Sequence, residues 1–283
     1  MSYQVRPADC NDATALQNFI HGQNQMHRHL DWRDSLEWLG REPFFLLEEN
    51  YRVLAALAAP PEPASVAWVR LFGNNARISA ERAWEELFPS ILAVLADLRP
   101  RPTLASLALR EWYSRLLQNQ GFRHHQDIIV FLYDHATPPP PLKIDPDIQV
   151  RRLTLQDLEQ VAVIDHLSFE AIWQLSLDDL RHAFGKSSYM TVAEINGQVV
   201  AYQMSNHTGT YAHLSRLAVH PNLQRRRIGY TLVQDLLEHF LSLHNCWGVT
   251  LNTQHDNPNS IALYERVGFH HTGERFPVYI YPS

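Results

Sequence analysis

The sequence predicts an α/β protein built from two consecutive domains of the same kind, each with a mixed β-sheet and helices. Three observations predict this class. The chain has 283 residues, about twice the ~150 residues of a typical domain. A pattern of residues in the first half returns in the second half. The second half also alternates strand-like and helix-like segments in an order that fits a mixed sheet.

Composition excludes several classes of protein. The chain carries 24 Lys and Arg against 30 Asp and Glu, a net charge of −6, which argues against a nucleic-acid binder. It has no apolar run of ~18 residues, and its N-terminus is too polar for a signal peptide. Two cysteines, Cys10 and Cys246, cannot build a disulfide framework. We therefore expect a cytoplasmic protein that binds neither nucleic acid nor a membrane.

The internal repeat has a very long period. Arg6 of YQVRPADCNDATAL and Arg151 of IQVRRLTLQDLEQV lie 145 positions apart, and EENYRVLAAL aligns with EINGQVVAYQ at 146. Arg70 and Arg216, each followed by leucine, also differ by 146, and the Gly-Phe dipeptides near the ends of the halves differ by 147. An offset that drifts so little indicates a duplicated domain.

A proline-rich segment separates the two repeats. It reads ATPPPPLKIDPD over residues 136–147. Four consecutive prolines favour a stiff polyproline spacer and prevent both a helix and a strand ladder. The sequence therefore predicts a first domain at residues 1–135, a linker at 136–147 and a second domain at 148–283.

The elements of the second half follow from local signals. A strand at 148–153 precedes Thr154, a suitable helix N-cap with Asp157 three residues later. Ser176 should cap another helix. Strands at 189–195 and 199–205 are then joined by Asn-Gly, the strongest hairpin signal.

The remaining elements continue this order. A third strand at 211–219 ends before Pro221, and apolar residues at helical spacing follow up to Leu241. A strand at 247–253, a short helix at 260–266 closed by glycine and the strand-like PVYIY complete the chain. The order βααβββαβα with a last strand implies a mixed sheet.

Two segments of this half carry a recognisable pattern. RLAVHPNLQRRRIGYTLVQDLL resembles the acetyl-CoA segment of the GNAT superfamily of acyl-CoA-dependent N-acetyltransferases, in which a strand leads into Q/R-x-x-G-x-G/A and a helix. NPNSIALYERVGF resembles the family's later segment N-x-x-A-x-x-L-Y-x-x-x-G-F, with Ser260 where alanine is usual. The resemblance covers the second half. It implies two tandem GNAT-like domains, each with a mixed, mostly antiparallel β-sheet flanked by helices.

The resemblance also implies an acetyl-CoA site. A helix start offers backbone N–H groups to the pyrophosphate, and the strand edge would pair with the pantetheine arm and aim an N–H at the thioester carbonyl. Arg227 stands where the family has its first glycine, so its side chain must point away from the phosphates or lie beside them. The binding residues implied are Leu217, Ala218, Val219, Gln224, Arg225, Arg226, Arg227, Ile228, Gly229, Tyr230, Asn257 and Tyr264.

Two residues are catalytic candidates. Tyr264 stands where the family places the tyrosine that protonates the departing CoA thiolate, and a phenol with a pKa of about 10 suits that task. The alternative is a tyrosine packed under the sheet. His213 falls where histone-acetylating relatives carry a catalytic glutamate, and an imidazole could accept a proton from an ammonium or a relay water. A water chain, with His213 as an ordinary strand residue, is the alternative. We expect no metal, because the histidine pairs lack cysteine or aspartate at metal spacing.

The first half lacks these features. At an offset of 146 the phosphate turn corresponds to ISAERA, residues 78–83, which has no glycine and places Glu81 opposite Arg227. Near the end, Leu117 replaces the tyrosine and Arg110 the asparagine. We therefore expect a degenerate GNAT-like domain with a structural or substrate-shaping role.

The expected activity is acetyl-CoA-dependent N-acetyltransfer to a primary amine, by direct attack in a ternary complex. Two alternatives remain. One is a catalytically inactive acyl-CoA-binding sensor or structural protein. The other is an acyltransferase whose acceptor differs, as in tandem relatives that build thiols or modify aminoacyl groups. The sequence does not identify the acceptor, and it leaves open whether the protein is a homodimer.

Overall fold

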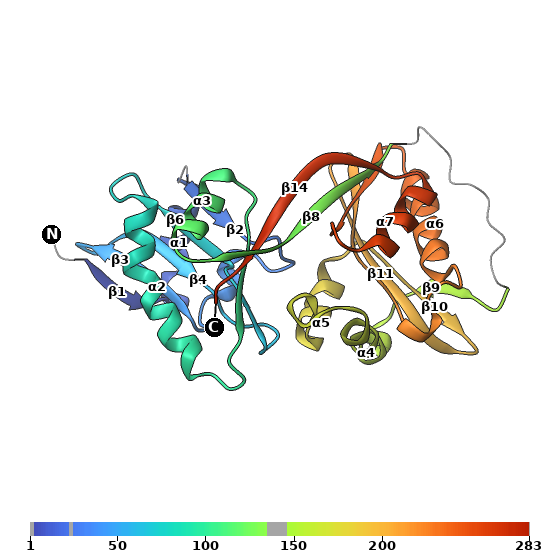
Figure 1. The fold of residues 1–283 in the computed structure, drawn as a ribbon, viewed down its shortest axis with the longest axis horizontal. Helices are drawn as coiled ribbons and strands as arrows, with labels where there is room; N and C mark the ends of the chain where they lie inside the picture. Colours follow the sequence, from blue (N-terminus) through green and yellow to red (C-terminus); the bar gives the residue numbers. More distant parts are fainter. Residues whose placement is uncertain (1–2, 23–24, 135–145, 283) are drawn as a thin grey trace. The chain divides into compact units, whose positions relative to one another are not determined.

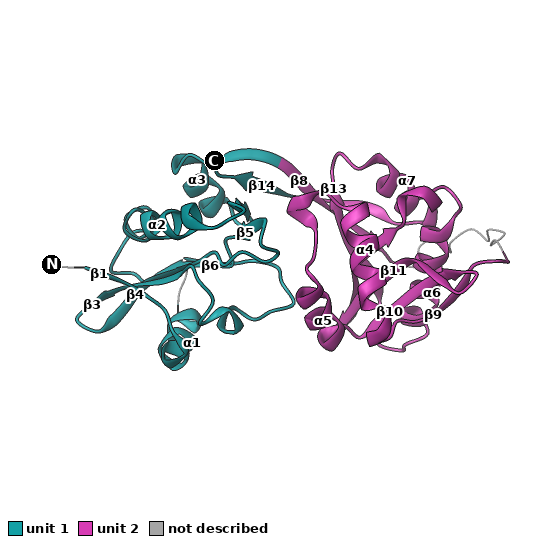
Figure 2. Ribbon diagram, turned by 90° about the horizontal axis from the view of Figure 1, so that it is seen from below, with its two compact units in different colours: residues 1–125, 276–283 teal, residues 126–275 magenta. Residues whose placement is uncertain are grey.

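The chain forms two compact units in the computed structural model, which describes residues 3–22, 25–134 and 146–282 (Figures 1 and 2). Unit 1 comprises Met1–His125 and Phe276–Ser283, and unit 2 comprises Gln126–Arg275. The units therefore differ from the predicted segments 1–135 and 148–283 at their ends. The predicted linker at 136–147 lies outside the described residues, apart from its last two positions.

Unit 1 contains a five-stranded sheet of order β1-β3-β4-β6-β2 and a second group of order β5-β7-β14. Helix α2 contacts β3 and β4, and α1 contacts β4. The bounds are β1 Gln4–Pro7, β2 Gln25–Arg28, β3 Phe44–Glu49, β4 Arg52–Ala58, β5 Val66–Trp68, β6 Leu71–Asn74, β7 Thr103–Leu107, α1 Ala13–His21, α2 Ala80–Asp97 and α3 Glu111–Asn119, with 3₁₀ helices at Cys10–Asp12 and Ser35–Trp38.

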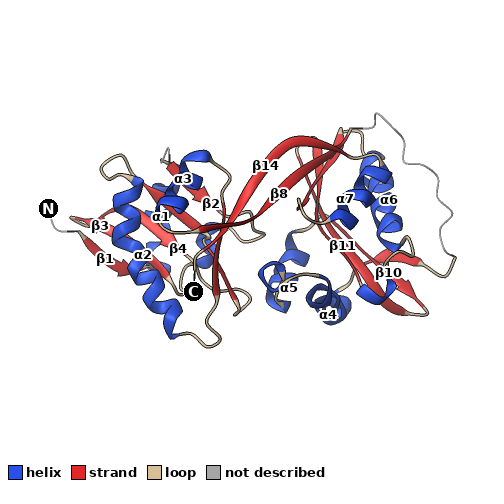
Figure 3. Cartoon of the chain, viewed as in Figure 1, coloured by secondary structure: helices blue, strands red, loops and turns tan. Residues whose placement is uncertain are grey.

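Unit 2 contains strands in the order β14-β8-β13-β12-β11-β10-β9. Helices α4 and α5 lie on one face of this sheet, and α6 and α7 lie on the other (Figures 1 and 3). The bounds are β8 Arg123–Tyr133, β9 Gln149–Arg152, β10 Tyr189–Ile195, β11 Gln198–Thr208, β12 Tyr211–Val219, β13 Gly248–Gln254, β14 His270–Ile280, α4 Leu158–Ser168, α5 Leu177–Lys186, α6 Ile228–Leu241 and α7 Pro258–Val267, with 3₁₀ helices at Leu155–Asp157, Ala171–Trp173 and Pro221–Leu223.

Each unit is completed by a strand from the other half of the sequence. The end of β14 pairs with β7 in unit 1, from Val278 opposite Leu107 onward. In unit 2 the end of β8 pairs with β13, with Tyr133 opposite Val249. The last strand of each repeat is thus exchanged, which explains why the compact units do not end where the repeats end.

The structure contains the turns and helix ends that local signals in the sequence predicted. Asn196 and Gly197 have φ values of 52° and 74°, as a type I′ turn requires. The Ser176 hydroxyl accepts from the Asp179 N–H at 2.9 Å and begins α5. Gly268 ends α7 with φ 109°. The predicted fold class is confirmed: the sheets are mixed, and β12–β13 and β5–β7 are parallel pairs among mostly antiparallel ones.

The repeat is visible as a duplicated ion-pair motif. In unit 1 the Arg6 guanidinium contacts Asp12 at 2.6 Å and Glu48 at 2.7 Å. In unit 2 Arg151 contacts Asp157 at 2.7 Å and Glu194 at 2.5 Å. In both units the arginine therefore ties the first strand to the first helical turn and to the hairpin that follows. Conservation of this geometry within one chain supports duplication of a common domain.

Candidate functional site

The parallel strands β12 and β13 separate partway along their length. Their pairing runs from Tyr211 opposite Gly248 to Leu214 opposite Leu251 and stops there, although β12 continues to Val219. Ser215 has no partner in β11, because the register shifts between Leu214 and Arg216. An unpaired residue of this kind is a β-bulge, which bends its strand. The bulge therefore turns the end of β12 away from β13 and leaves one edge of β12 open.

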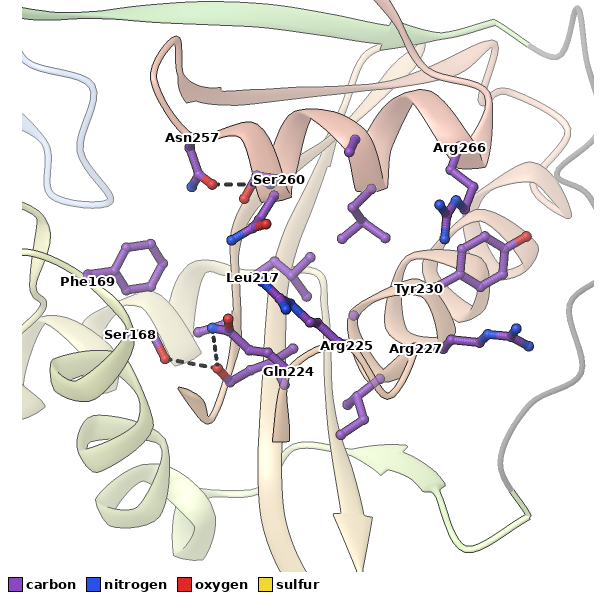
Figure 4. A pocket seen from close by; sticks show the side chains of 17 residues that line it. Ser168, Phe169, Leu217, Gln224, Arg225, Arg227, Tyr230, Asn257, Ser260 and Arg266 are labelled. Atoms are coloured by element: carbon purple, nitrogen blue, oxygen red, sulfur yellow. Dashed lines mark hydrogen bonds between the residues drawn. The ribbon is translucent and has the colours of Figure 1, made fainter. Parts of the chain in front are cut away.

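The alternation of backbone hydrogen bonds between β12 and β11 shows which backbone groups of β12 face the opening. The His220 N–H donates to the Val200 carbonyl of the strand-β11 region at 2.9 Å. In an antiparallel pair, bonding to one neighbour alternates along the strand. Ala218 therefore bonds toward β11, and the N–H groups of Leu217 and Val219 point to the open edge. The Val219 carbonyl accepts from Ser168 Oγ at 3.2 Å and from Gln224 Nε2 at 3.3 Å (Figure 4).

A cavity of about 550 Å³ lies between this open edge, the start of α6 and helix α7 (Figure 4). Most of the predicted binding residues line it: Leu217, Ala218, Val219, Gln224, Arg225, Arg227, Ile228, Gly229, Tyr230 and Asn257. Seven further residues line the cavity that the sequence did not point to: Ser168, Phe169, Asn259, Ser260, Ala262, Leu263 and Arg266. The α7 members recur at helical spacing, which was a usable signal. Ser168 is the last residue of α4 and Phe169 is its C-cap, and neither carried a signal.

The turn before α6 is held in an unusual conformation. Arg225 and Arg227 both have φ 64°, in the left-handed region that glycine adopts most readily. Arg227 is the N-cap of α6, and its carbonyl accepts the first helical bond from the Thr231 N–H at 3.0 Å. The N–H groups of Ile228 and Gly229 thus precede the first bond of the helix. In Figure 4 the Arg225 side chain reaches across the cavity, whereas Arg227 points away from it.

Gly229 lies at a close contact between three elements. A Cβ atom at this position would lie 3.2 Å from Leu263 Cδ2 and 3.5 Å from Val219 Cγ2. The absence of a side chain therefore lets α6 approach β12 and α7 closely. The same closeness brings the helix start to the open strand edge.

Asn257 and the start of α7 form the opposite wall. The Asn257 side-chain oxygen accepts from the Ser260 N–H at 3.1 Å and caps the helix, with proline in the first turn. The predicted residue near the ligand is thus also a helix cap. Leu263 and Arg266 lie along the same side of α7 and extend the wall.

Tyr264 lies behind this wall and does not line the cavity. It is 5% exposed and packs beside Phe131 and Phe269, with ring centroids 6.3 Å and 5.9 Å away. It shares a core cluster with Leu214 and Leu251, the last paired residues before the strands separate. Burial raises the pKa of the Tyr264 phenol above its usual value. Arg226 also lies outside the cavity lining.

His213 lies on β12 next to the separation point. Its cross-strand partner on β13 is Thr250, and its Nδ1 lies 2.8 Å from Thr250 Oγ1. The adjacent Ala212 and Leu214 belong to the core cluster shared with α6 and α7, so the His213 side chain points to the face that carries α4 and α5. Burial lowers the pKa of the imidazole. His213 does not line the cavity.

A buried ion pair supports the α4 side of the cavity. Arg216 directly follows the bulge and contacts the fully buried Asp165 of α4 at 2.6 Å. The Arg216 guanidinium lies 3.6 Å from the Phe169 ring centroid and also donates to the Trp173 carbonyl. These contacts fix the bent end of β12 to the end of α4, and so hold Phe169 at the cavity wall.

Among the described residues, no group of three or more His, Cys, Asp or Glu side chains could hold a metal ion. In the same part of the chain, every helix is too short or too polar to cross a membrane.

Comparison with known proteins shows what the region around this site resembles. Residues 158–269 match the model of the acetyltransferase (GNAT) family. The spore coat polysaccharide biosynthesis protein SpsD of Bacillus subtilis is 30% identical over 120 residues, which are 42% of this chain and 41% of that protein. The match thus spans about two-fifths of that relative's length.

Solved structures show the same fold. A tandem GNAT protein from the clavulanic acid biosynthesis pathway is similar over 100% of both chains, with a TM-score of 0.68 and 16% identity. A probable N-acyltransferase from Enterococcus faecalis V583 covers 99% of this chain and 71% of its own, with a TM-score of 0.73 and 9% identity. A GCN5-related N-acetyltransferase from Sphaerobacter thermophilus covers 98% and 95%, with a TM-score of 0.64 and 15% identity. At these identities the similarity concerns the fold, and the predicted pair of tandem GNAT-like domains is confirmed.

Proposed function

Residues 158–269 match the model of the acetyltransferase (GNAT) family, and on that premise we propose that the protein is an N-acetyltransferase. It transfers the acyl group of acetyl-CoA to a primary amine, which attacks the thioester directly in a ternary complex. The acceptor is a small molecule or side chain that carries such an amine. The proposal concerns unit 2 alone.

One arrangement carries the proposal: the open edge of β12 and the N-terminus of α6 face the same cavity. A CoA thioester has amides along its pantetheine arm and negative charge on its pyrophosphate. The N–H groups of Leu217 and Val219 suit the amides and the thioester carbonyl. The N–H groups of Ile228 and Gly229, at the positive end of a helix, suit the phosphates, and Arg225 adds a formal charge. The residues present therefore fit this donor.

The two catalytic candidates lie on opposite faces of the sheet near the separation point. The raised pKa of Tyr264 keeps its phenol protonated, so that it can donate to a thiolate. The lowered pKa of His213 keeps its imidazole neutral at neutral pH, so that it can accept a proton from the amine. Both residues flank the last pairs of β12 and β13, where the reacting carbon of a pantetheine thioester would lie.

The second candidate function is an acyl-CoA-binding sensor without turnover. The burial of Tyr264 behind the cavity wall favours this candidate, because a proton donor must reach the leaving sulfur. It shares the donor site with the enzyme and differs only in the absence of an acceptor reaction.

Among its described residues, unit 1 lacks the open strand edge and the unbonded helix start that the proposed donor site uses. Both edges of β6 are paired, with β4 on one side and with β2 on the other, where Met26 lies opposite Gly73. At the start of α2 the Ser79 hydroxyl accepts from the Arg82 N–H at 3.2 Å, so a donor of the helix start is already bonded. The strand edge and the helix start that support binding in unit 2 are thus occupied in unit 1.

A thiol-release assay tests the proposal. The full chain is incubated with acetyl-CoA and a panel of primary amines, and free CoA thiol is measured with a matched reaction that lacks amine. Release that depends on an amine and saturates with it is the expected result. Binding of acetyl-CoA without release with any amine would contradict the enzyme and leave the sensor.

A further inference from the structure

His213 and Thr250 form the second-to-last pair of the parallel ladder between β12 and β13. The last pair is Leu214 and Leu251, after which the strands separate. The hydrogen bond between the two side chains therefore lies at the apex of the opening. A residue that controls His213 here acts at the reacting end of the proposed donor site.

The hydrogen bonds around Thr250 determine the tautomer of His213. Thr250 Oγ1 donates to the Ala212 carbonyl at 3.2 Å, and a carbonyl can only accept. A hydroxyl has one proton, so Thr250 Oγ1 must accept in its second contact, with His213 Nδ1 at 2.8 Å. His213 Nδ1 therefore carries the proton. In the neutral ring this leaves the lone pair on Nε2.

We propose that Thr250 is a positioning residue that holds His213 in the Nδ1–H tautomer and so leaves Nε2 as the proton acceptor for the amine. This rests on the proposed function. In the step, an N–H bond of the substrate ammonium breaks and an Nε2–H bond forms, directly or through one water. The positive charge moves from the amine to the imidazole ring, and Nδ1–H continues to donate to Thr250.

The surroundings of His213 are consistent with this role. Its cross-strand partners, Thr250 on β13 and Asn206 on β11, are uncharged. Burial alone accounts for the lowered pKa of His213, with no contribution from a charged group among the described residues. His213 is thus controlled by its hydrogen bond to Thr250 rather than by a neighbouring charge. Serine at position 250 keeps that bond, whereas valine keeps the shape and removes it.

Nitrogen-15 NMR of histidine-labelled full chain tests the tautomer directly. The chain has 16 histidines, and the His213 signals are identified by their loss in His213→Asn. We expect Nδ1–H in the parent and in Thr250→Ser, and a shift toward Nε2–H in Thr250→Val. Nε2–H in the parent, or Nδ1–H retained in Thr250→Val, would overturn the proposal. Thr253→Val on the same strand is the control and should leave the signals unchanged.

Turnover provides the second readout. Thr250→Val should lower kcat by roughly 10- to 100-fold, since general-base catalysis contributes about 10² or more, and should leave acetyl-CoA affinity unchanged. Thr250→Ser should restore most of kcat. Parent-like kcat in a folded Thr250→Val would overturn the positioning role. No thiol release in the parent with any amine would instead contradict the proposed function, and the NMR spectrum would still decide the tautomer.

Discussion

Arg227 shows how a residue outside the family pattern is accommodated. The family has glycine at this position, and Arg227 adopts the left-handed conformation that glycine would take, with φ 64°. The backbone of the turn is thus kept, and the side chain points away from the cavity (Figure 4). The cost is backbone strain of about 1 kcal/mol for a residue with a Cβ atom.

Replacement of Arg227 by glycine should therefore stabilise the chain. We expect Arg227→Gly to raise the free energy of unfolding by about 1 kcal/mol, measured by urea denaturation. Arg226→Gly is the control, because it removes the same charge from a residue that is not in the left-handed region. That variant should be destabilised, since glycine there adds only flexibility in the unfolded chain. Equal changes in the free energy of unfolding for the two variants would contradict backbone strain at Arg227.

Tyr264→Phe tests the proposed acid. The change removes only the hydroxyl and keeps the ring against Phe131 and Phe269. Turnover at saturating substrates should fall at least tenfold while acetyl-CoA affinity stays near that of the parent. Tyr113→Phe, a buried tyrosine of unit 1, should leave turnover unchanged. Equal kcat for Tyr264→Phe and the parent would remove Tyr264 from this role.

If His213 is the base, turnover should depend on pH in a defined direction. A base must be neutral, so turnover should fall only when the pH drops below the pKa of His213, which burial places under its usual 6.5. The acidic limb of the kcat profile should thus be centred below pH 6.5. His213→Ala should be slower and lack this limb. An unchanged limb in His213→Ala would indicate a water relay instead.

At the scale of elements, the motifs identified the strand and the helices that enclose the cavity, but not the bulge that opens the strand edge. The sequence predicted the strand at 211–219, a helix that extends to Leu241 and the helix around Tyr264. It could not predict the bulge at Ser215, because a bulge depends on the register with β11 and has no residue signature here. It also did not predict that β2 pairs with β6 in unit 1. Both features depend on pairing between distant residues.

The duplicated Arg–Asp–Glu motif links element stability to pH. In unit 2, the hydrogen bond that Arg151 donates to the Asp157 carboxylate lowers the pKa of Asp157 to about 2, from a usual value of 3.8. Because the folded pKa is lowered, this stabilisation is complete above pH 3.8 and is lost as the pH falls through about 2. Asp157→Asn should lower Tm by roughly 3 °C or more at pH 7, and the difference should shrink between pH 4 and pH 2.

The exposed Asp256 provides the matched control for this prediction. Asp256→Asn removes the same charge and should have the Tm of the parent throughout. A difference between Asp157→Asn and the parent that is equal at pH 7 and pH 2 would show that the ion pair does not account for it.

At the scale of the whole molecule, the chain is a duplicated fold; among the described residues, β12 has an open edge, whereas both edges of the corresponding strand β6 are paired. The repeat at offsets of 145 to 147 predicted the duplication correctly. It could not predict the strand exchange, since β8 and β14 occupy equivalent places in their repeats and only tertiary pairing assigns them to a unit. The predicted inert role of the first half stays a prediction, now with a physical reason in the paired edge of β6.

The central claim is one acyl-CoA site per chain, at the open edge of β12 and the start of α6. Isothermal titration of the full chain with acetyl-CoA tests it most directly. We expect a stoichiometry near one and loss of binding in Gly229→Asp, where a carboxylate enters at the phosphate site. Arg225→Glu should weaken binding without disturbing the packing of α6, and Gly185→Asp, with open space around its Cβ position, should bind like the parent. A stoichiometry near two, or full binding in both Gly229→Asp and Arg225→Glu, would contradict the account.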